Sequence, residues 1–236
     1  MASKEDPVPS VWARPPKALR PPALSRAAIV REAIVMLDED GIEALSMRKL
    51  GARLNAGATS MYRHVATKDE LMELAVDEVL GEVTVPQADE EDWRRTVAGC
   101  AHSFRATALR HPWLCAELGQ AGLAYLGPNL TALSERLITT LADAGFAEPH
   151  TAVDVVFSYA IGMSTTECAW LITVARSGQS EARFLARLVP ATDDETGQHP
   201  DDRTETGALG HLAIRDAKFG DGLAIVLDGL ATRLPD

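Results

Sequence analysis

The sequence is poor in cysteine and aromatic residues, and it lacks any sustained alternation of apolar and polar residues. Its three cysteines, Cys100, Cys115 and Cys168, are far apart, which argues against a disulfide-built scaffold. Small buried hydrophobic residues are the favoured interpretation for them, with redox sensing as the alternative. The absence of strand alternation predicts an all-α protein.

Acidic residues are absent from one segment of an otherwise acidic chain. The formal net charge is −11, from 23 basic and 34 acidic residues, yet the segment 46–68 (SMRKLGARLNAGATSMYRHVATK) holds five cations. Without these five, the formal net charge of the remaining residues is 18 − 34 = −16. A basic surface on an acidic protein suits a phosphate backbone, and a solvated basic face is the alternative. The five are Arg48, Lys49, Arg53, Arg63 and Lys68.

The same segment has the pattern of two short helices joined by a tight turn. Ser46 is a good N-cap, and an apolar stripe at helical spacing follows it. Asn55-Ala56-Gly57 breaks the stripe, because Asn tolerates the left-handed conformation that ends a helix. Ala58 to His64 is predicted to form a second helix, anchored by Met61 and Val65. Its small, hydroxyl and basic side chains suit a helix that enters a major groove.

Flanking helices complete a compact unit over residues 25–82. Ser25 can cap a helix that ends at Asp40-Gly41. Thr67 and Glu70 match a capping box, which predicts a fourth helix, Lys68–Val83. Before this unit, residues 1–24 hold six of the thirteen prolines and several cations. This segment is predicted to be extended, either as a disordered tail or as a basic arm in the minor groove.

Residues 83–236 are predicted to form a larger helical domain. Helices are expected at Asp92–Arg110, at Trp113–Gly119, from Pro128 to before Gly145, at 151–175 and at the C-terminal end. The acidic segment at about 191–207 is predicted to be a mobile loop. Residues 151–175 are long enough to span a membrane, but their carboxyl and hydroxyl groups favour a central helix of a soluble assembly. With no targeting segment recognised, we expect a cytoplasmic protein.

At this point a family resemblance becomes specific. Residues 24–82 resemble the N-terminal domain of TetR (tetracycline-repressor-like) transcriptional regulators, through Ser46–Leu50, Ser60–Val65 and Lys68–Leu71. The spacing of Tyr62, His64, Lys68 and Leu71 is matched as a set, whereas Asn55 stands where the family usually has Gly. Weaker similarity to the C-terminal domain of the tetracycline repressors continues beyond. The resemblance implies an N-terminal helix-turn-helix domain, a C-terminal ligand-binding and dimerisation domain, and a homodimer on palindromic operator DNA.

The resemblance also implies roles for particular positions. Arg48 could reach a guanine edge, and Tyr62, His64 and Lys68 would hold the DNA backbone. The full DNA-binding set is Met47, Arg48, Ala58, Thr59, Ser60, Tyr62, Arg63, His64 and Lys68. The last helix carries an apolar face expected at the dimer interface, made of Phe219, Leu223, Val226, Leu227 and Leu230. Two glycines on this helix, Gly222 and Gly229, would permit close approach of a partner.

A small, mostly apolar effector is implied for the second domain. The candidate ligand-binding residues are Cys100, Phe104, Trp113, Glu117, Met163, Thr166, Glu167 and Trp170, each of which could equally be ordinary core. Thr84 and Glu117 stand where tetracycline repressors have metal-chelating histidines, so a magnesium-tetracycline effector, a metal site and a cofactor are not expected.

Two other functions stay open at this stage. An all-α enzyme could use Glu117, Glu167, Asp154 or His102, although no HExxH, GxSxG or phosphate-loop motif is present. A helical interaction module without DNA is the other alternative. The basic segment 46–68 argues against both.

Overall fold

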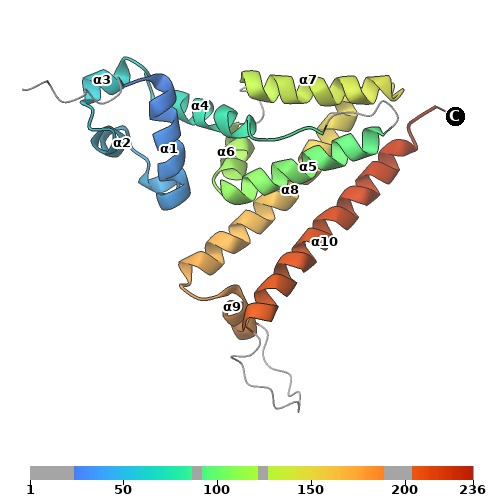
Figure 1. Cartoon of the computed structure of the whole chain (residues 1–236). Helices are drawn as coiled ribbons and strands as arrows, with labels where there is room; N and C mark the ends of the chain where they lie inside the picture. Colours follow the sequence, from blue (N-terminus) through green and yellow to red (C-terminus); the bar gives the residue numbers. More distant parts are fainter. Residues whose placement is uncertain (1–23, 87–91, 122–126, 189–203, 236) are drawn as a thin grey trace, which may run out of the picture.

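The computed structural model describes residues 24–86, 92–121, 127–188 and 204–235, and within these ranges every regular element is a helix (Figure 1). The predicted arm, except for Leu24, and most of the predicted loop 191–207 lie outside the described residues. The elements in order are α1 (Arg26–Asp40), η2 (Ile42–Ala44), α2 (Met47–Arg53), α3 (Ala58–Tyr62), α4 (Lys68–Leu80), α5 (Trp93–Arg110), α6 (Leu114–Ala121), α7 (Pro128–Asp143), α8 (Pro149–Arg176), α9 (Glu181–Leu188) and α10 (Thr204–Ala231).

Several expected boundaries require correction. Helix α3 ends at Tyr62 rather than His64, and α4 ends at Leu80 rather than Val83, one residue before Gly81. Helix α10 begins at Thr204, so the last four residues of the predicted loop are helical. Once a helix has formed, each further residue that joins it adds a backbone hydrogen bond, so a helix can extend into polar sequence. Polar composition alone therefore predicts the start of a helix poorly. The short elements η2 and α9 were not predicted.

The N-terminal helices begin at the predicted caps. The hydroxyl groups of Ser25 and Ser46 accept hydrogen bonds from the first turns of α1 and α2. The hydroxyl of Thr67 accepts from the Glu70 amide at 2.9 Å, and the Glu70 carboxylate accepts from the Ala66 amide at 2.6 Å. These bonds satisfy amides that have no partner within the helix. The predicted capping box is confirmed.

The turn between α2 and α3 depends on a left-handed residue. Asn55 has φ 49°, as predicted. The Ala56 amide donates to the Gly51 carbonyl at 2.8 Å, and the Asn55 amide donates to Ala52 at 3.2 Å. This pair of bonds is the Schellman arrangement, which closes the C-terminal end of α2. The chain can therefore reverse within three residues and direct α3 away from α2.

Helix α4 joins the two domains and packs against helices of both. It contacts α1 on the N-terminal side, and α5, α6 and α7 on the C-terminal side. Met61, Val65, Leu71 and Ala75 are fully buried in the hydrophobic core that includes α4. Figure 1 shows α1 to α3 at one end of the molecule, with α4 leading from them to α7. A displacement of α4 would consequently move the whole N-terminal unit.

Helix α8 is the centre of the C-terminal domain. It packs against α5, α7 and α10, and α10 runs beside it along the outer edge of the molecule (Figure 1). Length and composition alone would let α8 cross a membrane, with a mean hydropathy of 1.3 in its most apolar window. However, the central helix of a soluble bundle passes the same test. Its exposed positions include Thr151, Ser158, Gly162 and Thr165, which are small or polar rather than lipid-facing.

The crossing of α8 and α10 requires a glycine. The Tyr159 hydroxyl donates to the Phe219 carbonyl at 2.8 Å. A β-carbon at Gly222 would collide with that hydroxyl, whereas Gly229 has open space around its α-carbon. Gly222 therefore permits the predicted close approach, but its neighbour is α8 of the same chain.

Three of the five residues predicted for the dimer interface on α10 are covered by their own protomer. Phe219, Leu223 and Leu227 are buried inside the protomer, in the core shared with α5 and α8. Val226 and Leu230 are half-buried and pack against the same core. An apolar stripe reveals which face of a helix is covered, but not whether the covering element belongs to the same chain. The large exposed apolar residues of α10 are instead Leu212, Ile214 and Ile225.

The Asn55 turn leads to a stability prediction. Replacing Asn55 with Val should lower the free energy of unfolding by roughly 1–2 kcal/mol, because a β-branched residue is strained at positive φ. Replacing Asn55 with Gly should leave the free energy of unfolding within roughly a few tenths of a kcal/mol of the native value. Thermal unfolding followed by circular dichroism would compare the three proteins. Equal loss in both variants would show that the Asn side chain, rather than the backbone conformation, stabilises the turn.

Candidate nucleic-acid interface and ligand cavities

Four of the five cations in the basic segment are free to meet a polyanion. Arg48 and Lys49 project from α2, Arg63 follows α3 and Lys68 begins α4. All four are exposed, and no ion pair involves them among the described residues. They cluster on consecutive short elements at one end of the molecule (Figure 1). Such a cluster can neutralise several phosphates at once.

Arg53 is the exception within the segment. Its guanidinium contacts the carboxylates of Glu32 at 2.6 Å and Glu39 at 2.9 Å, both on α1. Hydrogen bonds to Glu39 and then to Glu32 raise the pKa of Arg53 above its ordinary value. This residue joins α2 to α1 instead of presenting charge to a ligand. The segment's five positive charges therefore leave four for binding.

Helix α3 presents small hydroxyl side chains on its exposed side. Thr59 and Ser60 are exposed, whereas Met61 is fully buried and anchors the helix. Tyr62 is 52% exposed, so it is not a core aromatic. The geometry suits a recognition helix whose first turn faces base edges.

The remaining predicted DNA-binding residues lie close by. Met47 and His64 are half-buried, with Met47 packed against the core, while the Ala58 side chain lies outside the described residues. Arg26, at the start of α1, was missed by the sequence analysis. Its Nε donates to the His64 carbonyl at 3.3 Å, which places a further exposed cation beside the end of α3. The contact joins residues 38 apart, so no local pattern could have revealed it.

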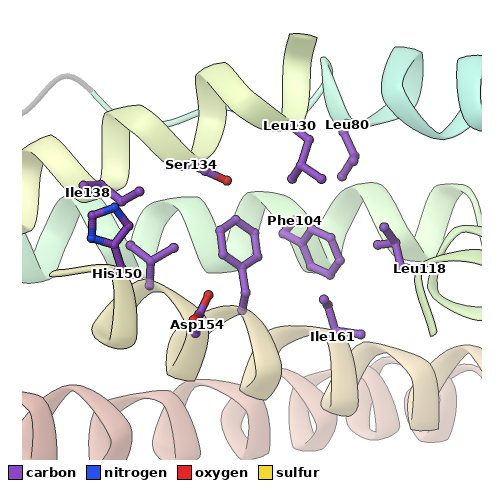
Figure 2. A pocket seen from close by; sticks show the side chains of 11 residues that line it. Leu80, Phe104, Leu118, Leu130, Ser134, Ile138, His150, Asp154 and Ile161 are labelled. Atoms are coloured by element: carbon purple, nitrogen blue, oxygen red, sulfur yellow. The ribbon is translucent and has the colours of Figure 1, made fainter. Parts of the chain in front are cut away.

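A cavity of about 240 Å³ lies between α4, α5, α6, α7 and α8. Figure 2 shows Ser134, His150 and Asp154 toward one end of the cavity, and Leu80, Leu118 and Ile161 toward the other. The rings of Phe104 and Phe157 meet edge to face inside it, with centroids 6.2 Å apart. The complete lining is Leu80, Phe104, Leu118, Leu130, Ser134, Ile138, His150, Val153, Asp154, Phe157 and Ile161.

A second cavity of about 390 Å³ lies where α8, α9 and α10 meet. Met163, Thr166, Glu167 and Trp170 contribute to it from α8. It shares no lining residue with the first cavity.

Two family models match the chain and together cover most of it. Residues 29–75 match the model for bacterial regulatory proteins of the tetR family. Residues 85–234 match the model for the tetracyclin repressor-like C-terminal domain. The chain belongs to the TetR family of DNA-binding transcriptional regulators.

Individual relatives agree with this family assignment. An HTH-type transcriptional regulator from Saccharopolyspora erythraea is 43% identical over 164 residues, or 68% of this chain and 69% of the relative. The HTH-type transcriptional repressor DrrR1 of Streptomyces coeruleorubidus is 30% identical over 220 residues, covering 89% and 78% of the two chains. The Streptomyces coelicolor TetR-family protein ActR in complex with actinorhodin has a TM-score of 0.67 and 28% identity, over 90% of this chain and 99% of ActR. These proteins are regulators, so the enzyme alternative has no support among them.

The ligand residues expected from the TetR resemblance do not form one site. Phe104 lines the first cavity, whereas Met163, Thr166, Glu167 and Trp170 line the second. Sequence spacing puts Met163 and Trp170, seven positions apart, on one face of a helix, with Glu167 between them. It could not show that α9 and α10 cover that face, together with Arg105 of α5.

Three further candidates line neither cavity. The Trp113 indole donates to Asp38 at 2.7 Å, at the joint between the domains. Burial raises the pKa of Glu117, which lies near Lys68 and Asp69 of α4. Burial also raises the pKa of Cys100 to about 12, so this thiol stays protonated as a small core residue. Helix register alone does not fix which neighbour a side chain meets, so the sequence could not separate these three from the residues that line the two cavities.

The exposed cations of the TetR helix-turn-helix can be tested one at a time for their part in DNA binding. Lys68→Ala should weaken binding to all sequences about equally and lower the slope of affinity against salt, because one phosphate contact is lost. Arg48→Ala should instead relax base preference at one position per half-site, at a cost of roughly 1–3 kcal/mol. Fluorescence anisotropy with operator and shuffled duplexes over a salt series would separate the two effects.

A matched control is available on α5. Arg94, half-buried and paired with Asp228 at 2.6 Å, lies outside the helix-turn-helix. Its replacement by Ala should leave the salt slope unchanged. An identical response of Arg48→Ala, Lys68→Ala and Arg94→Ala would mean that total charge, and not this surface, governs binding.

Proposed function

We propose that this TetR-family regulator is a cytoplasmic homodimeric repressor, which binds a palindromic operator and is released by a small aromatic effector. The observation that carries this proposal is that the first cavity lies directly against α4. Leu80 of α4 forms part of its wall, together with Leu130, Ser134 and Ile138 of α7. Because α4 leads into the helix-turn-helix, a molecule that fills the cavity acts on the DNA-reading unit.

A polar joint strengthens this linkage between α4 and α7. The Asp77 carboxylate of α4 accepts hydrogen bonds from the Asn129 and Leu130 amides at 3.0 and 3.1 Å. The Asn129 side chain in turn donates to the Asp77 carbonyl at 3.0 Å. Asp77 thereby caps α7 from another helix, where a carboxylate is also favoured by the helix dipole. A shift of α7 is transmitted to α4 through these bonds.

The N-terminal unit is attached to the C-terminal domain at a second point. Asp38 of α1 accepts from the Trp113 indole at 2.7 Å, and His111 Nδ1 lies 2.8 Å from the same carboxylate. His111 is buried between Asp38 and Glu82, with Nε2 3.3 Å from Glu82. The turn between α5 and α6 therefore holds α1 while the cavity acts on α4. With α1 held at one point and α4 displaced at another, a small shift of α4 rotates the helix-turn-helix unit.

The cavity lining favours an aromatic molecule with a polar or basic group. Phe104 and Phe157 offer ring faces and edges, and Asp154 is the acidic residue of the lining. Asp154 has no ion pair among the described residues. A ligand amine or hydroxyl near Asp154, His150 and Ser134 would meet this unpaired acceptor. That ActR binds actinorhodin, as its structure records, supports an aromatic effector for a related fold.

We place the dimer interface on the outer face of α8 and α10. Ile225 is 73% exposed on α10, and Val155 is an exposed apolar residue of α8. Gly162 of α8 and Gly229 of α10 have open space around them, so another helix can approach closely. Apolar residues this exposed on a long helix mark an association surface. Two such helices from each protomer would form a four-helix interface with two-fold symmetry.

Filling the cavity by mutation tests the switch without knowledge of the effector. Ser134→Phe should place a ring between α7 and α4 and weaken operator affinity by roughly 5- to 150-fold, the range of typical allosteric couplings. Thr139→Phe adds the same ring to an exposed position of α7 and should have no effect. Anisotropy titrations with a duplex selected by the native protein would give the affinities.

A double variant tests the route through Asp77. In a chain that carries Asp77→Ala, Ser134→Phe should weaken operator affinity by a smaller factor than it does in the native chain. The reason is that α7 then no longer holds α4 by hydrogen bonds. Full operator affinity in a folded Ser134→Phe variant would contradict coupling between this cavity and DNA binding.

The assembly prediction distinguishes the outer face from the core. Ile225→Glu should yield folded monomers with weak operator affinity, because a dimer would desolvate two unpaired carboxylates. Leu223→Glu should instead lower the thermal midpoint sharply, since Leu223 is 2% exposed within the protomer. Val35→Glu, a similar exchange at an exposed site on α1, is the control. An Ile225→Glu protein that sediments as a native-like dimer would place the interface elsewhere.

A further inference from the structure

The second cavity differs chemically from the cavity against α4. Both of its acidic lining residues are already paired. The Glu167 carboxylate accepts from Arg105 at 2.7 and 2.9 Å and from Arg215 at 2.9 Å. The Glu181 carboxylate pairs with Arg215 and accepts from the Trp170 indole at 2.6 Å. Side-chain exposure is only 9% for Glu167 and 13% for Glu181, so little of either charge faces the opening.

Besides the paired Arg215, α10 contributes two further polar side chains to the lining. Lys218 is exposed and His211 is half-buried, and neither has a hydrogen bond or ion pair among the described residues. Both line the cavity. With the two acids held by arginines, the Lys218 ammonium and the N–H of the His211 ring are left as donors for a ligand. A ligand with an anionic acceptor therefore supplies the hydrogen-bond partners that Lys218 and His211 lack among the described residues.

The apolar part of the same cavity includes a fixed aromatic ring. The Trp170 indole is held by its bond to Glu181 and packs edge to face against Phe184, with ring centroids 5.4 Å apart. Met163 and Ile214 continue the apolar wall. An indole whose orientation is already fixed loses little conformational freedom when a flat molecule packs against it.

We propose that the cavity between α8, α9 and α10 is a second ligand site, for a compact aromatic molecule that carries one anionic group. The aromatic body contacts Trp170 and Met163, and the anion contacts Lys218 and His211. This charge preference is opposite to that of the cavity against α4, where Asp154 is the unpaired group. The inference stands apart from the proposed switch, because no helix of the helix-turn-helix unit and no part of α4 lines this site.

Two probes with one ring system and opposite charge test the proposal on the full chain. Naphthalene-2-carboxylate should bind saturably in calorimetric titrations, and Lys218→Met should weaken it by roughly tenfold through loss of one charge-assisted hydrogen bond. Lys218→Arg should retain most of the affinity. Trp170→Leu should weaken the carboxylate as well, and Arg31→Met, which removes an exposed cation from α1, should not.

The ammonium analogue, naphthalen-2-ylmethylammonium, reports on the other cavity. Asp154→Asn should weaken this cation and leave the carboxylate unaffected. Three results would overturn the second site: no saturable carboxylate binding, binding unchanged by both Lys218→Met and Trp170→Leu, or equal affinity of both probes for this cavity. Failure of the ammonium probe alone would count against the chemistry proposed for the cavity at α4 and leave the second site standing.

Discussion

The cap that Asp77 places on α7 is the contact on which the arrangement of the two domains depends. One carboxylate on the connector helix satisfies two amides at the start of α7, and Asn129 returns a hydrogen bond to the connector. Any side chain at Gly127 would collide with Asp77. The joint therefore has almost no steric freedom, and the positions of α4 and α7 are set together. The cavity between these helices is therefore lined by two elements whose positions change together.

Local sequence signals predicted the DNA-reading half well because its structure is governed by neighbouring residues. Capping by Ser25, Ser46 and Thr67 acts over three or four positions, and the left-handed Asn55 acts at a single position. The resemblance to TetR regulators rested on the same short-range pattern. The charge of Arg53 was misjudged, because its partners on α1 lie 14 and 21 residues away in the chain.

The ligand-binding half was predicted less well because its contacts join distant residues. The helices themselves followed from apolar periodicity, since α5, α7 and α8 lie close to their expected ranges. The assignment of each face did not follow. Glu167 was expected to anchor a ligand, yet it pairs with Arg105, 62 residues away, and with Arg215, 48 residues away. Likewise the apolar stripe of α10 covers its own protomer. Periodicity identifies a buried face but carries no information on which element buries it.

The close crossing at Gly222 bears on how two protomers meet. Because the Tyr159 hydroxyl occupies the space of the missing side chain and bonds the Phe219 carbonyl, α8 and α10 are held in one register. Neither helix can slide or rotate past the other without losing that bond and the contacts around it. A protomer consequently carries its outer face already formed before any encounter. Association between preformed surfaces requires little reordering, so its rate should follow diffusion and charge rather than refolding.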